Sequence, residues 1–135
     1  MVQAKMTFIT LPVKNLNTSV DFFAALGFEF NPQFTDENAT CLILNDTTFV
    51  MLVVESFFKN FTKKDLSDAT ATTESILGFS AENRDEVDAF VEKALASGGS
   101  VSNDTVDHGF MYSGSFQDPD GHLWEVMYME PNVVQ

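Results

Sequence analysis

The sequence predicts an α+β fold of two βαβββ modules, residues 1–66 and 67–135, whose curved sheets form a cup. Three observations predict it. Strand and helix patterns follow one another in the same order in both halves. The halves align with an offset of 68 residues, which sets residues 13–15 on residues 81–83. A Ser/Thr-rich stretch in "FFKNFTKKDLSDATATTE" joins them and has the character of a linker. Such a repeat implies two units that bury a shared interior.

The first half predicts a strand, a helix and three further strands. In "LNTSVDFFAALGF" apolar residues recur at helical spacing, Asn17 or Thr18 can cap the start, and Gly27 can end the helix in a left-handed conformation. We therefore expect a helix near 17–26. β-Branched residues and partial alternation indicate the strands. They are expected at 5–13, 28–34, 39–45 and 47–54.

The second half repeats this order. "TESILGFSAE" predicts a strand, and "NRDEVDAFVEKALASGG" predicts a helix near 84–97. Asn83 and Glu86 have the spacing of a capping box, and Gly98 can end the helix. "DPDG", residues 118–121, predicts a type I turn that sets the register of the last strand. The remaining strands are expected near 99–103, 109–117 and 121–129.

Composition narrows the classes of function. A formal net charge of −13 argues against binding to a nucleic-acid backbone or to an anionic membrane, because both need clustered Lys and Arg. A hydrophobic content of 44% with 14 Phe is enough to form a core. No apolar run reaches the roughly 18 residues of a membrane span, and no secretory signal is evident. We expect a cytoplasmic protein that binds neither nucleic acid nor membrane.

Two segments point to a known family. "LPVKNLNTSVDFFAALGFEF" and "FQDPDGHLWEVMYMEP" resemble the signature segments of the vicinal oxygen chelate superfamily, which includes glyoxalase I, bleomycin-resistance proteins, fosfomycin-resistance enzymes and extradiol dioxygenases. The resemblance spans essentially the whole chain and is closest to bacterial predicted lactoylglutathione lyases. It implies one domain over residues 1–135, a homodimer, and a cup that holds a divalent metal (Zn, Ni, Mn or Fe) on four strands.

The residues at these four positions are mostly apolar. The resemblance places them at Phe8, at Met51 or Leu52, at Ile76 and at Glu125. Phe, Ile and Leu are not metal ligands, and a thioether suits these cations poorly. We therefore predict no metal and no other cofactor. The cup is expected to bind a small organic ligand through Phe8, Leu52, Ile76, Tyr112 and Met127.

Glu125 is the one position that matches the family pattern. Alternation predicts that Leu123 and Met127 share its face, with Trp124 packed beneath a helix on the other. A carboxylate on an apolar face is costly unless it is paired, hydrogen-bonded or protonated. Glu125 is then either a general acid or base or a carboxylate satisfied by a backbone N–H, a Tyr hydroxyl or water.

"VDHGFMY", residues 106–112, brings His108 and Tyr112 to the predicted cup mouth. His108 either acts with Glu125 as a catalytic residue or caps a surface loop. Tyr112 either donates a hydrogen bond to a ligand or forms part of the wall. Residues 57–64, with three Phe and three Lys, form either a short amphipathic helix that covers the cup as a basic aromatic lid or a solvated connector.

Three functions follow from these residues. The first is a metal-free module that binds a planar or amphipathic small molecule. The second is a lyase, isomerase or dioxygenase with a metal on Glu125, His108 and a group from the partner subunit. The third is a metal-free enzyme that uses Glu125 as acid or base. Activity on the methylglyoxal–glutathione hemithioacetal with added Ni²⁺ or Zn²⁺ separates the second from the others.

Overall fold

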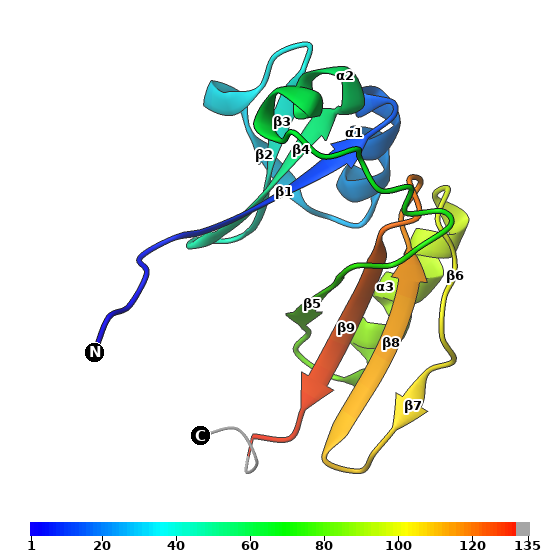
Figure 1. The fold of residues 1–135 in the computed structure, drawn as a ribbon. Coiled ribbons are helices and arrows are strands. Elements are labelled where there is room, and N and C mark those ends of the chain that lie inside the picture. The colour runs from blue at the N-terminus through cyan, green and yellow to red at the C-terminus, as the bar shows by residue number, and fades with distance from the viewer. Residues whose placement is uncertain (132–135) are drawn as a thin grey trace. The chain divides into compact units, whose positions relative to one another are not determined.

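The computed structural model divides the chain into two compact units, Met1–Ser67 and Asp68–Gln135, and describes residues 1–131 (Figure 1). Each unit has one sheet with both parallel and antiparallel strand pairs, and one longer helix. The α+β class predicted from the sequence is therefore confirmed. Within the described residues, no helix is both long and apolar enough to cross a membrane.

The first unit is a four-stranded sheet with α1 on one face. Its elements are β1 (Thr7–Val13), α1 (Leu16–Ala25), β2 (Glu29–Asn31), η1 (Pro32–Phe34), β3 (Ala39–Asn45), β4 (Thr48–Val54), α2 (Glu55–Phe58) and η2 (Lys59–Phe61). The strand order is β1-β4-β3-β2, and only β1 and β4 are parallel. α1 buries Phe22 and Phe23 in the core. α2 and η2 lie where a short amphipathic helix was one of the two alternatives for residues 57–64. That this segment covers a ligand stays a prediction.

The first helix begins at Leu16 because Asn15 is its N-cap. The Asn15 backbone is extended, and its side chain accepts a hydrogen bond of 3.1 Å from the backbone N–H of Thr18. The prediction of Asn17 or Thr18 as the cap is therefore wrong, by two or three residues. The prediction that Gly27 follows the helix in a left-handed conformation is confirmed by its φ of 102°.

The second unit is a five-stranded sheet with α3 on one face. Its elements are β5 (Ile76–Ser80), α3 (Arg84–Ala96), β6 (Ser100–Val101), β7 (Val106–Asp107), β8 (Met111–Gln117) and β9 (Leu123–Met129). The strand order is β5-β9-β8-β6, with β7 also paired to β8. Asn83 caps α3 as predicted, since its side chain accepts from the N–H of Glu86 at 2.8 Å. The predicted strand at 99–103 is shorter, and β7 was not predicted.

The core of the second unit lies between α3 and the sheet. Trp124, Val126 and Phe116 are fully buried there, and the ring of Trp124 stacks on that of Phe116. The prediction that Trp124 packs beneath a helix is confirmed. Gly114 lets α3 approach β8, because a Cβ at this position would lie 2.7 Å from a methyl carbon of Val91. This packing leaves the other face of the sheet to carry the candidate site.

The turn between β8 and β9 is held by Asp118 and Gly121. The N–H of Gly121 donates to the carbonyl of Asp118 at 3.0 Å, as the predicted turn requires. Gly121 has a φ of 88°, and a Cβ on it would lie 3.0 Å from the carbonyl oxygen of Ala69. The turn therefore needs glycine both for its backbone conformation and for its close approach to the chain at Ala69.

Gly121→Ala is expected to lower the free energy of unfolding by about 2 kcal/mol, because a left-handed backbone and a backbone contact both oppose the added methyl group. Gly98→Ala is the matched control. Gly98 has a φ of 108°, but a Cβ added to it would meet open space, so about 1 kcal/mol is expected from the backbone alone. Urea denaturation of both variants measures the difference. Equal losses would contradict the contact with Ala69.

Candidate ligand-binding site

The candidate site lies on the face of the second sheet that points away from α3. In β9, Leu123, Glu125 and Met127 are half-buried, while Trp124 and Val126 between them are fully buried against the helix. The alternation predicted around Glu125 is therefore confirmed. In β8, Ser115 lies opposite Glu125 and Ser113 lies opposite Met127. The same face thus presents one carboxylate, two hydroxyls and apolar side chains.

A pocket of about 280 Å³ lies over this face, formed entirely by residues of the second unit. Its lining consists of three apolar and six polar side chains. The apolar residues are Val106, Met111 and Met127, and the polar residues are Asn103, Asp104, His108, Ser113, Ser115 and Glu125. Pockets of this composition suit small organic molecules, which bury an apolar body and orient a few polar groups.

The loop that borders the pocket is fixed to the sheet by Ser115. Its hydroxyl accepts a hydrogen bond from the backbone N–H of Asn103 at 2.9 Å and donates one to the carbonyl of Asn103 at 3.0 Å. These two bonds satisfy Ser115 and hold Asp104, the next residue, at the pocket edge. Ser115 therefore shapes the pocket, and its hydroxyl is already engaged within the protein.

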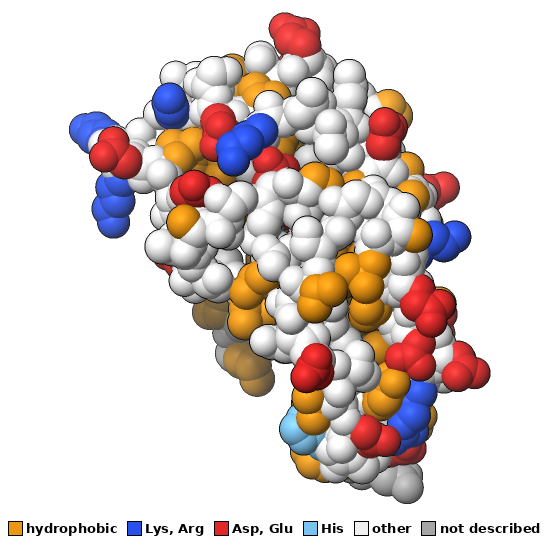
Figure 2. All heavy atoms as spheres, turned by 90° about the vertical axis from the view of Figure 1, so that its right-hand side faces the viewer, with side chains coloured by type: hydrophobic (Ala, Val, Ile, Leu, Met, Phe, Trp, Pro, Cys, Tyr) orange, Lys and Arg blue, Asp and Glu red, His pale blue; other side chains and the backbone are white. Residues whose placement is uncertain are grey.

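The electrostatics of the pocket favour a cationic or hydrogen-bond-donating ligand. Among residues 1–131, no side chain or backbone N–H donates to or pairs with the Glu125 carboxylate. Asp104 adds a second carboxylate, and the described lining contains no Lys or Arg. Acidic and hydrophobic side chains are interspersed over the surface of the molecule in the view of Figure 2. A concave site lined by one sign of charge attracts ligands of the opposite sign.

His108 lies on the hairpin between β7 and β8, and it lines the same pocket as Glu125. Its backbone N–H donates to the carbonyl of Met111 at 2.8 Å, and its ring centroid is 6.2 Å from that of Phe110. The structure thus brings together the two residues that the sequence singled out for chemistry. Their catalytic and ligand-binding roles stay predictions.

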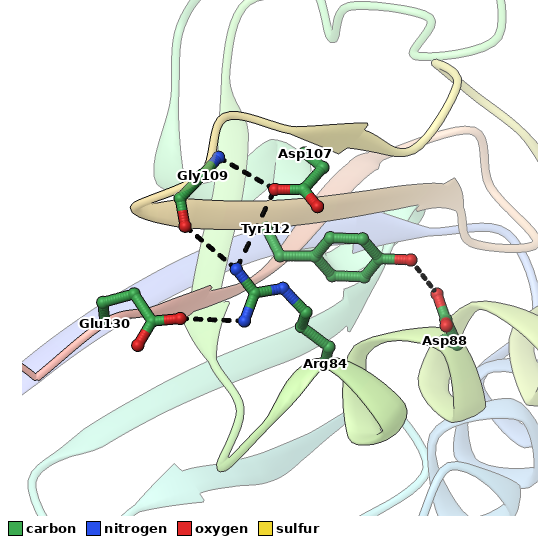
Figure 3. A network of polar contacts seen from close by, with 6 residues as sticks. All are labelled: Arg84, Asp88, Asp107, Gly109, Tyr112 and Glu130. Carbon is green, nitrogen blue, oxygen red and sulfur yellow. Dashed lines mark hydrogen bonds and ion pairs between the residues drawn. The ribbon is translucent and has the colours of Figure 1, made fainter.

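Tyr112 does not line the described pocket, and its role as a ligand contact stays a prediction. It lies on the α3 side of the sheet, where its hydroxyl donates to Asp88 at 2.7 Å (Figure 3). This hydrogen bond, followed by burial, raises the pKa of Tyr112. The physical reason is strand alternation, because Met111 and Ser113 on either side of Tyr112 carry the pocket face.

Three further predicted ligand residues lie outside the described pocket. Leu52 is 0% exposed and belongs to the core, and its role as a ligand contact stays a prediction. Its neighbour Met51 is half-buried and belongs to the opposite face, by alternation. Phe8 in the first unit and Ile76 in the second are 58% and 51% exposed. Both remain accessible to a ligand.

The donor set at the four family positions does not fit a divalent metal. Phe8 and Ile76 offer no donor atom, Met51 offers a thioether, and only Glu125 offers an oxygen. Across residues 1–131, no group of three or more His, Cys, Asp or Glu side chains is arranged to hold a metal ion. We therefore derive no reaction step through a metal.

Among the residues that line the pocket, sequence reasoning missed Asn103, Asp104, Val106, Met111, Ser113 and Ser115. The two serines carried a usable signal, because a turn at 118–121 joining antiparallel strands sets Ser115 opposite Glu125. Nothing in the sequence around Asn103 and Asp104 indicated that these loop residues line the pocket. They reach the pocket only through the hydrogen bonds of Asn103 with Ser115.

Comparison with known proteins shows the same fold throughout. Residues 5–126 match the model of the Glyoxalase/Bleomycin resistance protein/Dioxygenase superfamily. Hypothetical protein SA1046 from S. aureus is 28% identical, with a TM-score of 0.78 and coverage of 95% of each chain. A glyoxalase/bleomycin resistance protein/dioxygenase family enzyme from Burkholderia phytofirmans PsJN is 13% identical, with a TM-score of 0.77, over 93% of this chain and 99% of that one.

A third solved structure with this fold is a fosfomycin resistance protein. The genomically encoded fosfomycin resistance protein FosX from Listeria monocytogenes is 19% identical, with a TM-score of 0.69 and coverage of 98% of each chain. At this identity the likeness concerns the fold. No curated protein matches the sequence.

Proposed function

The chain belongs to the glyoxalase/bleomycin resistance protein/dioxygenase superfamily, and from this premise we propose that it binds a small planar or amphipathic molecule on the open face of its second sheet. Glu125 is the acceptor for a cationic or hydrogen-bond-donating group of that ligand. Met111, Met127 and Val106 contact its apolar body. Thioether side chains suit this task because they adapt to irregular ligand shapes.

The observation that carries the proposal is the Glu125 carboxylate in the pocket, without a partner among residues 1–131. A half-buried carboxylate beside thioether and alkyl groups loses hydration, and a donor from the ligand offsets that loss. The apolar residues at the other family positions support organic ligand binding over metal binding.

A second candidate is an enzyme that uses Glu125 and His108. The presence of both side chains in one pocket favours it, since a carboxylate and an imidazole are suited to moving a proton. It takes two forms, a metal-free acid–base enzyme and a metal-dependent lyase or dioxygenase completed by a partner subunit. From the family resemblance we also propose a cytoplasmic homodimer. A monomer mass by light scattering at micromolar concentration would contradict the dimer.

The test compares a cation with its neutral counterpart. Titration calorimetry near neutral pH measures binding of N-methylquinolinium and of quinoline to the wild-type protein and to Glu125→Gln. We expect the cation to bind the wild-type protein more tightly than quinoline does. Glu125→Gln should weaken cation binding about tenfold, because a charge-assisted contact is lost, and leave quinoline binding unchanged.

Glu92→Gln is the matched control, since it removes the same charge from an exposed position of α3. If Glu92→Gln weakened cation binding as much as Glu125→Gln does, the net charge of the protein would explain the binding. This result would contradict a site at Glu125. Stoichiometric, tight binding of Zn²⁺, Ni²⁺ or Mn²⁺ that Glu125→Gln removes would favour the metal-dependent enzyme. Turnover of the methylglyoxal–glutathione hemithioacetal with such a metal would do the same.

A further inference from the structure

Arg84, the first residue of α3, joins three separate parts of the second unit (Figure 3). Its Nη1 donates to a carboxylate oxygen of Glu130, just after β9, at 2.8 Å. Its Nη2 donates to the carbonyl of Gly109, at the tip of the β7–β8 hairpin, at 2.9 Å. The same nitrogen lies 3.9 Å from the carboxylate of Asp107. The planar guanidinium group of Arg84 thus holds the hairpin and the end of β9 against the start of α3.

Two tyrosine rings hold the guanidinium in place. Its central carbon lies 5.4 Å from the ring centroid of Tyr128 and 5.8 Å from that of Tyr112. Tyr112 is fixed in turn by its hydrogen bond to Asp88 on α3. The hydrogen bond to Glu130 is the largest of the effects that raise the pKa of Arg84, so the group stays charged. Its orientation is therefore set from several sides.

The hairpin that Arg84 holds is also one wall of the ligand pocket. Val106, His108 and Met111 all belong to it and line the pocket on the face opposite Arg84. Its own pairing is slight, because β7 has only two residues, Val106 and Asp107. The tip contains Gly109 with a φ of 84°, a residue with wide conformational freedom. Two contacts from outside the hairpin add to this pairing at its tip: Arg84 Nη2 donates to the Gly109 carbonyl, and the Glu130 N–H donates to the Phe110 carbonyl at 2.9 Å.

We propose that Arg84 is a positioning residue for the pocket: its guanidinium fixes the β7–β8 hairpin so that His108, Val106 and Met111 face the ligand. This inference rests on the proposed ligand-binding function of that face. Arg84 itself does not line the pocket. Its effect on a ligand is indirect, through the fraction of molecules in which the hairpin is already in place.

The expected size of the effect follows from that fraction. If the hairpin of an Arg84 variant is in place in about one molecule in ten, the apparent dissociation constant rises about tenfold. Arg84→Met keeps an unbranched aliphatic side chain but removes the guanidinium group and its charge. Arg84→Lys keeps the charge but not two parallel donors, so it should recover only part of the loss. Lys93→Met is the matched control, since it removes one positive charge near the end of the same helix.

Two measurements on the full chain test the proposal. Amide hydrogen exchange without ligand is expected to speed up at residues 106–111 in Arg84→Met. The amides of Leu77 and Val126, on buried strands, report global unfolding and should change less. Calorimetry with N-methylquinolinium should then show about tenfold weaker binding to Arg84→Met, intermediate binding to Arg84→Lys and unchanged binding to Lys93→Met. The His108 imidazole resonance should shift with the probe in the wild-type protein and broaden in Arg84→Met.

Unchanged amide exchange at residues 106–111 in Arg84→Met would overturn the proposal. Faster exchange there, together with unchanged probe affinity and an unchanged His108 resonance in that variant, would overturn it as well. Equal acceleration at Leu77 and Val126 would overturn it too, because Arg84 would then act on global stability. Failure of the wild-type protein to bind the probe would contradict the proposed function. In that case the exchange rates and the His108 resonance still decide whether Arg84 positions the hairpin.

Discussion

Replacing Trp124 with alanine is expected to lower the free energy of unfolding by about 3–5 kcal/mol, the largest loss expected from a single substitution in this unit. Trp124 is 0% exposed and contacts Phe116 and Phe79 through its ring. Its indole Nε1 donates to a carboxylate oxygen of Asp118 at 3.1 Å. The substitution removes the largest buried side chain of the unit and leaves a cavity beneath α3.

Chemical denaturation followed by far-UV circular dichroism measures this loss. Phe110→Ala is the control, because Phe110 is an aromatic residue of the same sheet region but 51% exposed. We expect it to cost less than about 1 kcal/mol, as most surface substitutions do. A loss for Trp124→Ala as small as that of Phe110→Ala would contradict the core described between α3 and the sheet.

Asp118→Asn is expected to lower the free energy of unfolding by about 2–3 kcal/mol. One carboxylate oxygen accepts the backbone N–H groups of Asp120 and His122, at 2.9 and 3.0 Å, and the other accepts Trp124 Nε1. An amide has one acceptor oxygen, so its NH₂ group would face either the indole N–H or the two backbone donors. A buried donor without an acceptor then remains in the core.

The pH dependence of this loss has a definite sign. Burial raises the pKa of Asp118 from 3.8, while the charge of His122 and the hydrogen bonds from Trp124 and the backbone lower it. A carboxyl group whose pKa is higher in the folded than in the unfolded protein stabilises the folded state at pH values below the unfolded-state pKa. This contribution is lost as pH rises through the folded-state pKa. Asn has no such titration, so the difference in unfolding free energy between the two proteins should narrow as pH rises from about 4 through the raised pKa of Asp118.

Glu92→Gln is again the control, since it removes an exposed carboxylate of the same unit. Its difference in unfolding free energy from the wild-type protein should stay within about 0.5 kcal/mol over the same pH range. An Asp118→Asn variant as stable as the wild-type protein, or a difference that widens as pH rises, would contradict this account of the buried carboxylate.

Local patterns in the sequence determined the elements and their order. The spacing around Asn83 and Glu86 predicted α3 to within one residue, because a capping residue and an apolar stripe act over a few positions. "DPDG" predicted the turn before β9, and alternation from that turn correctly put Glu125 and Met127 on one face with Trp124 on the other. The family resemblance came from the same segments, and the superfamily match over residues 5–126 confirms it.

Only the tertiary structure decided which faces meet and which polar groups pair. A shift of one residue in a strand moves a side chain to the other face of the sheet. The structure sets Leu52 in the core and turns Tyr112 toward α3, away from the pocket. The contacts of Arg84 join residues 25 and 46 positions apart in the chain, at Gly109 and Glu130. No local pattern encodes such pairs. They form only when the helix and sheet pack, whereas the pairing of β7, β8 and β9 brings His108 and Glu125 into one pocket.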